Sequence, residues 1–348
     1  MNFSQEIISW YNEHKRELPW RNTHDPYIIW LSEIIMQQTR IEQGLPYFTR
    51  FIEEFPTVSH FAAASEDKVL NLWQGLGYYS RGRNMHFTAN VVMEEHEGYF
   101  PTSYAKLIKL KGIGEYTAAA ISSFSANEVK AVVDGNVFRL LSRYFGIDEV
   151  INSSKGKRLF FDLANDLIDP SHPGLYNQAI MEFGSLQCRY KKPDCFICPL
   201  RSACVAYRDN RIDELPVKLK KQPNRNRYFN YIVARRDEKI LLNKRGPNDI
   251  WQNLHEFPLF ETSAEFPPYQ IVNDQQFKEF FGERAIIRSV HQPRKHMLSH
   301  QNIYAIFIEI ENFEDQFIEK SEWFYASQAD FENLALPKLI FENLKKFV

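Results

Sequence analysis

The chain has 348 residues, about twice the length of a typical domain, which favours two domains. Hydrophobic residues make up 44% of the sequence and charged residues 25%, a composition that excludes a largely disordered protein. The formal net charge is −2, from 42 Lys and Arg against 44 Asp and Glu, which argues against a surface that binds polyanions over its whole extent.

The N-terminal part of the chain, residues 1–205, has a helical pattern. Between Pro26 and Gln38 the apolar residues recur at positions 27, 30, 31, 34 and 35, which is one face of a helix, with Gly44 and Pro46 as stop signals. Similar segments lie near 47–55, 66–74, 80–96, 103–109, 115–125, 136–145, 156–168 and 175–187. No long segment of alternating polarity interrupts them, so we predict an all-α domain over residues 1–205.

A candidate anion-binding turn lies at residues 110–117, between two of these segments. Gly112 and Gly114 bracket one apolar residue and permit a tight turn, and the helix that follows begins with unpaired backbone N–H groups. Such amides, together with the helix dipole, suit a phosphate group of DNA. A Gly-x-Gly turn between helices is also common without any ligand, so the motif alone does not decide between the two.

An acidic residue, Asp134, follows two β-branched residues and precedes Gly135 and Asn136. Taken locally, Asp134 is best explained as the N-cap of the helix that starts at Asn136. Its place after the hairpin and before a cluster of cysteines keeps a catalytic role open.

All four cysteines of the chain lie within 17 residues, at Cys188, Cys195, Cys198 and Cys204. A disulfide framework would link distant parts of the chain, whereas this C-x6-C-x2-C-x5-C spacing gathers four thiols around one point. Tetrahedral zinc and an iron–sulfur cluster both use such a set, and the spacing does not separate them. The basic residues between these cysteines suit either contact with phosphate or a solvated loop.

The residue pattern changes after residue 205. Residues 206–227 carry seven basic and three acidic side chains with little periodicity, which predicts a basic linker that orders against a nucleic-acid backbone. Residues 228–348 contain short runs rich in β-branched and aromatic residues, at 228–234, 240–243, 286–290 and 302–310, and helical stretches near 273–281 and 335–347. We predict an α+β domain there.

Taken together, the motifs resemble the helix–hairpin–helix DNA glycosylases of the endonuclease III superfamily, and most closely the adenine DNA glycosylase (MutY) family. The resemblance is carried by Leu18-Pro19-Trp20-Arg21, Trp30-Leu31-Ser32-Glu33, Met36-Gln37-Gln38-Thr39, residues 72–81, residues 133–137 and the cysteine loop. It is dense over residues 5–208 and thinner beyond. It implies an all-α helix–hairpin–helix glycosylase domain with an iron–sulfur loop, followed by an α+β Nudix-like domain.

The resemblance implies that two carboxyl groups cleave the N-glycosidic bond of adenine. Such cleavage needs an acid that protonates the base and a carboxylate that stabilises an oxocarbenium-like sugar. By the resemblance, Glu33 donates the proton, and Asp134, next to Asn136, stands beside the sugar. Glu33 lies within the apolar run 28–36, which suits an acid of raised pKa, although a solvated glutamate on the outer helix face fits the composition as well.

Tyr116 occupies the hairpin position at which strand-cutting relatives in this superfamily carry a lysine that forms an imine with the sugar. Tyrosine cannot form that imine, but its hydroxyl can donate a hydrogen bond to a catalytic carboxylate or a reacting water. We therefore predict a monofunctional glycosylase that leaves an abasic site, with little or no lyase activity.

The resemblance also assigns residues that bind DNA and its bases. Gln38 and Tyr78 match the wedge positions that fill the space left by a flipped base, and Thr39 and Leu76 match contacts to the opposite base. The adenine pocket and the phosphate-binding turn comprise Arg16, Trp20, Arg21, Glu182, Gly112 and Gly114. Ordinary core packing is the alternative for the aromatic and leucine side chains of this set.

The second domain resembles the Nudix-like domain that reads 8-oxoguanine in this family. Residues 228–348 lack the R-E-x-x-E-E string with which Nudix hydrolases bind Mg²⁺, so we do not expect hydrolysis of nucleotide pyrophosphates. The Phe-Ser-His element of the family stands here as Leu298-Ser299-His300, which keeps Ser299 available but lacks the aromatic ring. In the hairpin, Lys111 replaces the usual proline, a change that should not weaken phosphate binding.

We therefore predict a monomeric base excision repair enzyme that excises adenine opposite 8-oxoguanine or guanine in double-stranded DNA. We expect a 4Fe–4S cluster on the four cysteines, with zinc as the alternative. A thymine glycosylase acting on T·G mismatches and, from another class, a non-catalytic iron–sulfur redox sensor are the alternative functions. No apolar run is long enough for a bilayer and no secretory signal is visible, so we expect a soluble intracellular protein of the cytoplasm, or of the nucleoid in a bacterium.

Overall fold

The computed structural model describes residues 2–220, 223–314 and 322–347. The chain divides into two compact units, of which the first comprises Met1–Ala63 and Asn84–Lys221 and the second comprises Ala64–Arg83 and Gln222–Val348. The short segment Ala64–Arg83 therefore packs with the C-terminal part of the chain, although its helical pattern alone placed it with residues 1–205.

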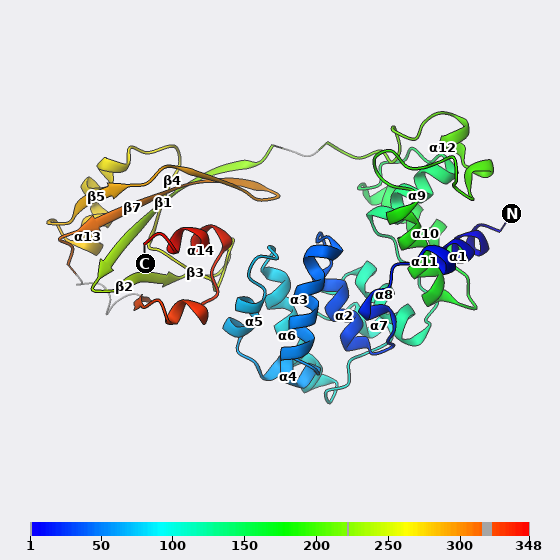
Figure 1. The fold of residues 1–348 in the computed structure, drawn as a ribbon, viewed down its shortest axis with the longest axis horizontal. Coiled ribbons are helices and arrows are strands. Elements are labelled where there is room, and N and C mark those ends of the chain that lie inside the picture. The colour runs from blue at the N-terminus through cyan, green and yellow to red at the C-terminus, as the bar shows by residue number, and fades with distance from the viewer. Residues whose placement is uncertain (1, 221–222, 315–321, 348) are drawn as a thin grey trace. The chain divides into compact units, whose positions relative to one another are not determined.

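The helices of the first part of the chain follow one another with short connections (Figure 1). They are α1 (Phe3–His14), η1 (Pro19–Arg21), α2 (Pro26–Ile35), α3 (Ile41–Glu54), α4 (Val58–Ala63), α5 (Glu66–Leu72), α6 (Ser80–Glu95), α7 (Tyr104–Leu107), α8 (Glu115–Ala126), α9 (Gly135–Phe145), α10 (Ser154–Leu167), α11 (Pro173–Leu186), η2 (Arg201–Ala203) and α12 (Val205–Arg208). Helix α5 belongs to the second unit. The described residues of the first unit form no strand, as the sequence predicted.

Two helices, α8 and α11, form the centre of the first unit. Helix α2 packs against α8, while α11 packs against α1, α8 and α9. Both α8 and α11 are buried on most sides, as expected for helices without a polar face. A Cβ atom on Gly174 would lie 2.5 Å from the carbonyl oxygen of Ser123, so the close approach of α11 to α8 requires glycine.

The turn between α2 and α3 differs from the prediction. Gly44 and Pro46 do not end a helix, because α3 begins at Ile41 and contains both. A Cβ atom on Gly44 would lie 2.5 Å from the sulfur atom of Met36. Gly44 therefore serves the close packing of the residue that caps α2 rather than a helix stop.

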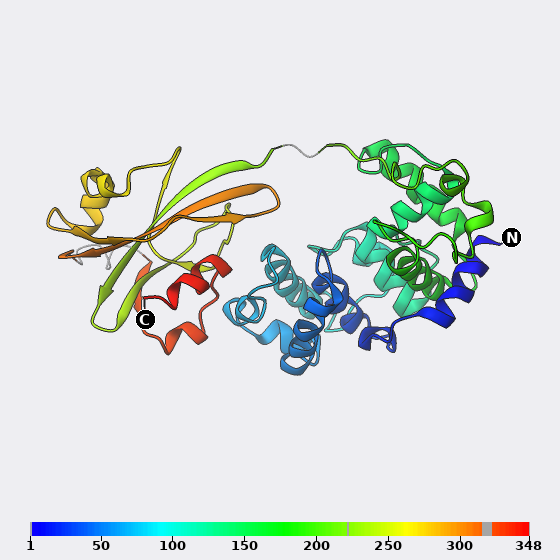
Figure 2. The same cartoon turned by 45° about the horizontal axis from the view of Figure 1, so that its top comes forward.

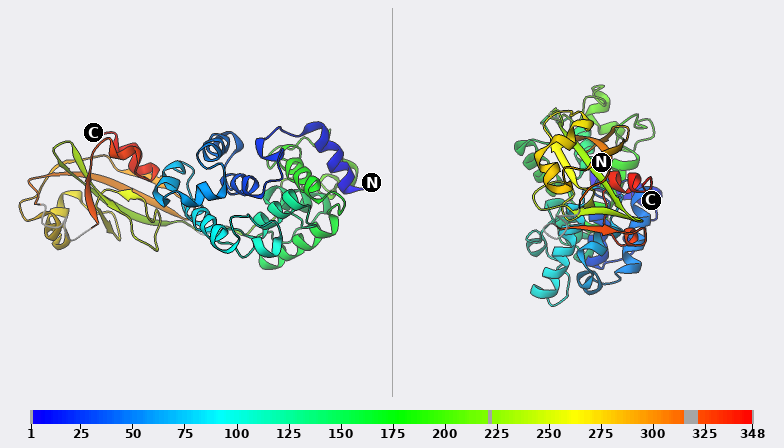
Figure 3. Two further views of the ribbon diagram at one scale, coloured as in Figure 1. Left: turned by 90° about the horizontal axis from the view of Figure 1, so that it is seen from below. Right: turned by 90° about the vertical axis from the view of Figure 1, so that its left-hand side faces the viewer.

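The second unit is built on a mixed sheet. Its strands are β1 (Arg225–Arg236), β2 (Lys239–Lys244), β3 (His255–Glu256), β4 (Leu259–Thr262), β5 (Ile286–Val290), β6 (Arg294–Met297), β7 (Gln301–Glu311) and β8 (Trp323–Ala326). The order along the sheet is β3-β2-β1-β7-β5, while β4 pairs with β1, β6 with β7 and β8 with β2. In Figure 3 these strands form one twisted layer.

The long strands β1 and β7 run parallel in the middle of the sheet, with Arg225 opposite Gln301 and Ala234 opposite Ile310. The other helices are η3 (Pro268–Asn273), α13 (Gln275–Phe281), η5 (Asp330–Glu332) and α14 (Lys338–Leu344). Figure 2 shows α13 and α14 at different parts of the sheet. Phe277 of α13 packs with one set of alternating residues of β1 and β7, and Phe347, just after α14, contacts Phe307 from the other set. The α+β prediction is confirmed.

The predicted linker, residues 206–227, is structured over most of its length. It begins inside α12, and the Val217 carbonyl accepts a hydrogen bond of 3.1 Å from the backbone N–H of Ile151. The backbone N–H of Leu219 donates to Oδ1 of Asn152, and β1 already begins at Arg225. None of the described helices is long and apolar enough to cross a bilayer.

Candidate active site

The first pair of site residues lies between α2 and α8. The hydroxyl of Tyr116, in the first turn of α8, donates a hydrogen bond of 2.7 Å to Oε2 of Glu33 on α2. The same hydroxyl lies 3.8 Å from the sulfur atom of Met181 on α11. The three helices at the centre of the unit thus meet at the Glu33 carboxyl group.

Glu33 has the electrostatics of an acid that holds its proton near neutrality. Burial raises its pKa from 4.5 to about 7, and the nearby carboxylate of Asp134 adds to the rise. The hydrogen bond from Tyr116 and the positive charge of Arg21 oppose the rise without cancelling it. The Glu33 residue as a whole is half-buried, while burial of its carboxyl group is the largest cause of the raised pKa.

Asp134 is held at the start of α9. Its Oδ1 accepts hydrogen bonds of 2.8 and 2.7 Å from the backbone N–H groups of Asn136 and Val137, as an N-cap does. Its Oδ2 accepts a bond of 2.7 Å from the side-chain amide of Asn136. The segment before it is fixed by α11, because the backbone N–H of Val132 donates to Oδ1 of the buried Asn177.

The structure brings together carboxyl groups that are 101 residues apart in the sequence. The charge of Asp134 raises the pKa of both Glu33 and Tyr116, so the three side chains act on one another. Burial raises the pKa of Asp134 itself, while its hydrogen bonds from Val137 and Asn136 lower it. Asp134 can therefore cap α9 and at the same time interact electrostatically with Glu33 and Tyr116.

A buried arginine that the sequence analysis missed, Arg139, joins Asn136 to the cysteine loop. Its guanidinium group donates hydrogen bonds of 2.9 Å to Oδ1 of Asn136, 2.6 Å to the Gly184 carbonyl and 2.8 Å to the Cys188 carbonyl. Asn136 in turn holds Asp134. The signal in the sequence is that Arg139 and Arg143 share one face of α9 with apolar residues, an unusual place for a solvated side chain.

Replacing Arg139 by glutamine is expected to lower the free energy of unfolding by about 2–4 kcal/mol, because two buried carbonyl groups and the Asn136 amide lose their charged donor. Denaturant unfolding measures the change. The matched control is Arg158→Gln on the exposed face of α10, which should change stability by less than about 0.5 kcal/mol. Equal losses in both variants would contradict this account.

Arg16, Arg21 and Glu182 form a second polar cluster near Trp20. The Oε2 atom of Glu182 accepts hydrogen bonds of 2.6 Å from Arg16 and 2.8 Å from Arg21. Burial raises the pKa of Glu182, but the hydrogen bonds from both arginines outweigh this effect and lower the pKa to about 2. Trp20 is half-buried and packs edge-on against Phe48 at 5.0 Å. Glu182 is therefore a charged anchor for two arginines.

The Gly-x-Gly turn has the open geometry that the motif predicts. Gly112 has φ +81°, and a Cβ atom there would lie 2.9 Å from Cβ of Asn84, so the turn requires glycine at this position. Gly114 is the N-cap of α8 and has no side chain to cover the first N–H groups of the helix. A Cβ atom on Gly114 would meet nothing within 4 Å. The amides are accessible to an anion.

The four cysteines line one pocket of about 30 Å³ beside α9 and α11. Burial raises the pKa of the thiols of Cys195, Cys198 and Cys204, and the pKa of Cys198 reaches about 12. The negative charges of the neighbouring cysteines raise all three values further. Within residues 2–220, 223–314 and 322–347, no three ligand-type side chains stand close enough to hold a metal ion. Four soft donors around one pocket still fit an iron–sulfur cluster or zinc, which hold them as thiolates.

Arg143, fully buried on α9, holds the start of the cysteine loop. It donates hydrogen bonds of 2.7 Å to the Arg189 carbonyl, 3.1 Å to the Tyr190 carbonyl and 3.1 Å to the Leu215 carbonyl. A guanidinium N–H also lies 3.6 Å from the sulfur of Cys188. A buried positive charge beside the thiols favours their deprotonated form.

In the second unit, Leu76 and Tyr78 lie on a tight turn between α5 and α6. Gly75, Gly77 and Tyr78 all have positive φ angles, and Arg81 donates hydrogen bonds of 3.3 Å to the carbonyls of Leu76 and Gly77. Leu76 is buried, whereas the Tyr78 ring is 43% exposed. The turn thus presents the tyrosine outward. In the first unit, Gln38 is exposed with φ +54°, and Thr39 is half-buried.

The turn at Leu76 and Tyr78 faces a pocket of about 760 Å³ in the second unit. Ser299, at the tip of the hairpin of β6 and β7, lines the same pocket, with its hydroxyl 3.2 Å from Nδ1 of His300. The structure therefore brings together Leu76, a predicted opposite-base contact, Tyr78, a predicted wedge residue, and Ser299 of the Leu298-Ser299-His300 element.

Comparison with known proteins finds a matching family for each of the two parts of the chain. A family model described as HhH-GPD superfamily base excision DNA repair protein matches residues 31–164, and one described as NUDIX domain matches residues 230–346. The adenine DNA glycosylase of Buchnera aphidicola subsp. Baizongia pistaciae is 33% identical over 354 residues, which cover 99% of this chain and 97% of that protein. The adenine DNA glycosylase of Rattus norvegicus is 40% identical over 62% of this chain and 44% of that protein.

Solved structures agree on the fold. A thermostable thymine-DNA glycosylase matches with a TM-score of 0.56 and 25% identity over 60% of this chain and 95% of that chain. Endonuclease III in a non-covalent complex with DNA matches with a TM-score of 0.51 and 18% identity over 60% of this chain and 94% of that chain. The second of these similarities is one of fold alone.

Proposed function

The chain belongs to the adenine DNA glycosylase family, and we propose that it removes adenine mispaired with 8-oxoguanine or guanine from double-stranded DNA and leaves an abasic site. The observation that carries this proposal is the Glu33 carboxyl group, whose pKa of about 7 lets it hold a proton at neutral pH. Adenine is a poor leaving group until a ring nitrogen is protonated, and a positioned acid supplies that proton.

Asp134 has the complementary role in this proposal. As the glycosidic bond breaks, positive charge develops on the sugar, and a carboxylate beside it lowers the energy of that state. The start of α9 and Asn136 hold Asp134 in place through hydrogen bonds that favour its charged form. These bonds support the proposal that Glu33 donates the proton and that Asp134 supplies the stabilising charge.

Tyr116 is proposed to keep Glu33 oriented and to exclude lyase chemistry, because a phenol forms no imine with the sugar. Tyr116→Lys is expected to introduce strand cleavage. The measurement is covalent trapping on DNA by borohydride, with Tyr116→Phe as the control that removes the hydroxyl without adding an amine. A Tyr116→Lys protein that is folded and releases adenine but yields no trapped complex would contradict the assignment.

DNA recognition is proposed to use three sets of residues. Gly112 and Gly114 offer backbone amides to a phosphate, and the Arg16–Arg21–Glu182 cluster with Trp20 forms the adenine pocket. Gln38 and Tyr78 fill the space left by the flipped adenine, and Thr39 and Leu76 contact the opposite base. In the second unit, Ser299 lines the same pocket as Leu76 and Tyr78 and is proposed to contribute to reading the opposite base. We propose that the protein acts as a monomer inside the cell.

We infer that Cys188, Cys195, Cys198 and Cys204 hold a 4Fe–4S cluster. When bound, the cluster cross-links the loop between α11 and α12. Purified protein is then expected to be brown and to contain about four iron atoms per chain, and Cys198→Ser should lose both. A colourless protein with one zinc per chain would replace the cluster by zinc and leave the glycosylase proposal intact.

Single-turnover base release tests the function directly. The duplexes differ at one pair only, A·8-oxoguanine, A·G, A·C or T·G, and each reaction is analysed with and without hot alkali to reveal abasic sites. We expect alkali-dependent cleavage at adenine, fastest opposite 8-oxoguanine. Cleavage only at T·G would assign the chain to thymine release, the activity named for one structural relative. Tight binding without cleavage would favour the redox sensor.

A further inference from the structure

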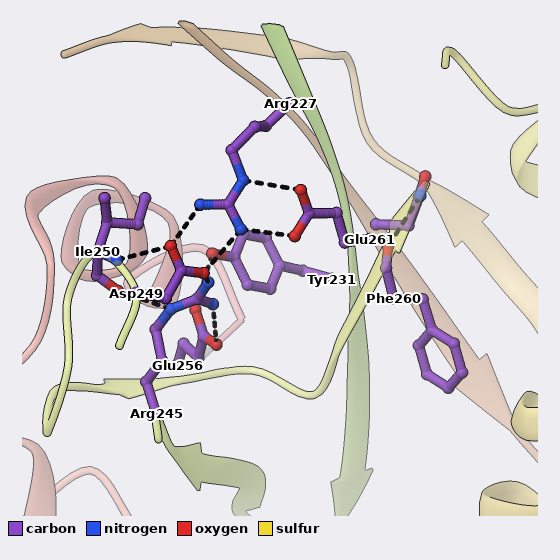
Figure 4. Close-up of polar contacts among 9 residues, drawn as sticks. Arg227, Tyr231, Arg245, Asp249, Ile250, Glu256, Phe260 and Glu261 are labelled. Atoms are coloured by element: carbon purple, nitrogen blue, oxygen red, sulfur yellow. Dashed lines mark hydrogen bonds and ion pairs between the residues drawn. The ribbon is translucent and has the colours of Figure 1, made fainter. Parts of the chain in front are cut away.

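A loop of the second unit, residues 245–254, is held by a network of charged side chains (Figure 4), two of which, Arg227 and Asp249, line the pocket. Arg227 on β1 donates hydrogen bonds of 2.6 and 2.7 Å to the two carboxylate oxygens of Asp249 and bonds of 2.7 and 2.6 Å to those of Glu261. Arg245 binds Asp249 from the other side and donates to Glu256 at 2.6 Å. Two arginines thus fix one aspartate.

The same aspartate organises the backbone of the loop. Its Oδ1 accepts a hydrogen bond of 2.7 Å from the N–H of Ile250, and the Arg245 side chain donates to the Ile250 carbonyl at 2.7 Å. Burial raises the pKa of Asp249, but its hydrogen bonds, that from Arg227 the largest, and the charge of Arg245 hold it well below the ordinary range. Asp249 is therefore a permanent charge that ties the loop to β1.

Three residues of the loop, Asn248, Trp251 and Asn253, have left-handed φ angles of +68°, +58° and +63°. Asparagine adopts this region readily, whereas the bulky side chain of Trp251 makes it cost about 1 kcal/mol or more. Such conformations persist only where the surroundings over-determine them, and they gather at sites that clamp a ligand. Here the over-determining contacts are those of Asp249 and Arg245.

Residues 251–253 contact both the hairpin that carries Ser299 and the segment 64–83 that carries Tyr78. Trp251 packs edge-on against His296 of β6 at 5.8 Å, two residues before the turn that carries Ser299. The Gln252 carbonyl accepts a hydrogen bond of 2.9 Å from Arg83, and the Asn253 amide donates to Glu66. Arg83 and Glu66 flank the turn that carries Tyr78, so the loop spans the distance between the two predicted reading elements.

We propose that Asp249 is a positioning residue for recognition of the opposite base, because it locks the loop that sets the Tyr78 turn and the Ser299 hairpin at a fixed spacing. This inference rests on the proposed function. A base between two such elements is read by contacts whose strength depends on tenths of an ångström, so loosening the loop weakens discrimination before it affects the distant carboxyl groups. Asp249 itself needs no contact with DNA in this role.

The test uses the full-length protein and the rates of adenine release opposite 8-oxoguanine and opposite guanine under single turnover. Asp249→Asn keeps the shape of the side chain but loses the charge that both arginines bind. The ratio of the two rates is expected to fall about tenfold, with the rate at A·G changed less than about twofold. Asn253→Gly keeps the left-handed backbone and removes only the bond to Glu66, and it should lower the ratio about threefold.

The matched control is Arg284→Gln, which removes an exposed ion pair with Glu314 in the same unit, and it should leave the ratio unchanged. Thermal unfolding identifies variants that do not fold, and if Asp249→Asn fails in this way, Asn253→Gly decides. A wild-type protein without preference for 8-oxoguanine would reject that part of the proposed function and the inference with it. A wild-type preference retained in both variants, or an equal fall of both rates, would overturn the inference alone.

Discussion

Replacing Glu33 by glutamine is expected to lower the rate of adenine release by about a thousandfold, because general acid catalysis contributes roughly a hundred- to ten-thousandfold to such reactions. Glutamine keeps the size of the side chain and can still accept the hydrogen bond from Tyr116. It cannot release a proton to the base. Binding of the same duplex should change little, since a pKa of about 7 leaves about half of the Glu33 side chains already neutral at pH 7 in the native protein.

The pH dependence of the rate of adenine release tests the role of Glu33 as the acid in a second way. The acid must be protonated, so the rate should fall about tenfold per pH unit above pH 7, as expected for a pKa of about 7. Asp134 must be charged, and because its pKa is raised, the rate should also fall on the acidic side, which gives a bell-shaped pH profile. In Glu33→Gln the alkaline fall should disappear from the residual rate.

The control is Glu53→Gln on the exposed face of α3, which makes the same chemical change outside the site. It should retain the wild-type rate and pH profile. A Glu33→Gln protein that releases adenine at more than about a tenth of the wild-type rate would show that another group protonates the base.

The raised pKa of Glu33 also costs stability, with a sign that can be checked. Between pH 4.5 and 7 the folded chain holds a proton that the unfolded chain releases, so stability falls as pH rises through this window. The full shift corresponds to up to about 3 kcal/mol, less where water reaches the side chain. Glu33→Gln should therefore unfold at a higher temperature than the wild type above pH 7 and at a similar temperature below pH 4.5. A lower melting temperature at pH 8 would contradict the burial argument.

Asp134→Asn is the second substitution with a large expected effect, a fall in the rate of adenine release of about a hundred- to a thousandfold. The reason is that the developing positive charge on the sugar loses its counter-charge. Asparagine is as good an N-cap as aspartate, so the bonds from the N–H groups of Asn136 and Val137 can persist. The bond from the side-chain amide of Asn136 to Oδ2 is lost, because the new amide group donates where the carboxylate accepted, so stability should fall by about 1–3 kcal/mol.

Asp274 provides a matched control, because it caps α13 of the second unit through a bond to the N–H of Phe277. Asp274→Asn makes the same change at another helix start and should leave adenine release unaltered. Single-turnover rates with thermal unfolding of both variants separate the two functions of Asp134. If Asp134→Asn lost activity only in proportion to lost folded protein, Asp134 would be a cap and nothing more.

The sequence was sufficient for much of the fold and for the family. The helical period before residue 205 and the β-branched runs after 228 predicted the helical part and the mixed sheet, because these patterns reflect which face of each element is buried. The motifs around Glu33, Asp134 and the four cysteines identified the family before any coordinates were known.

Two local features of the structure could not be predicted from the sequence. A glycine and a proline, Gly44 and Pro46, signal a helix end, yet α3 runs through both, with Gly44 close to the side chain of Met36. Arg139 shows no motif, and its importance lies in carbonyl groups that come from α11 and the cysteine loop, more than 40 residues away in the chain.

The sequence by itself therefore determined the elements, the residue types available for chemistry and the order in which they occur. Only the tertiary structure decided that Glu33 lies in an environment that raises its pKa to about 7, that Asp134 acts on it, and that residues 64–83 pack with the C-terminal unit. The reason is physical: helical periodicity and capping are local properties of the chain, whereas desolvation, the field of a second carboxylate and the choice of packing partner are set by groups that only folding brings close.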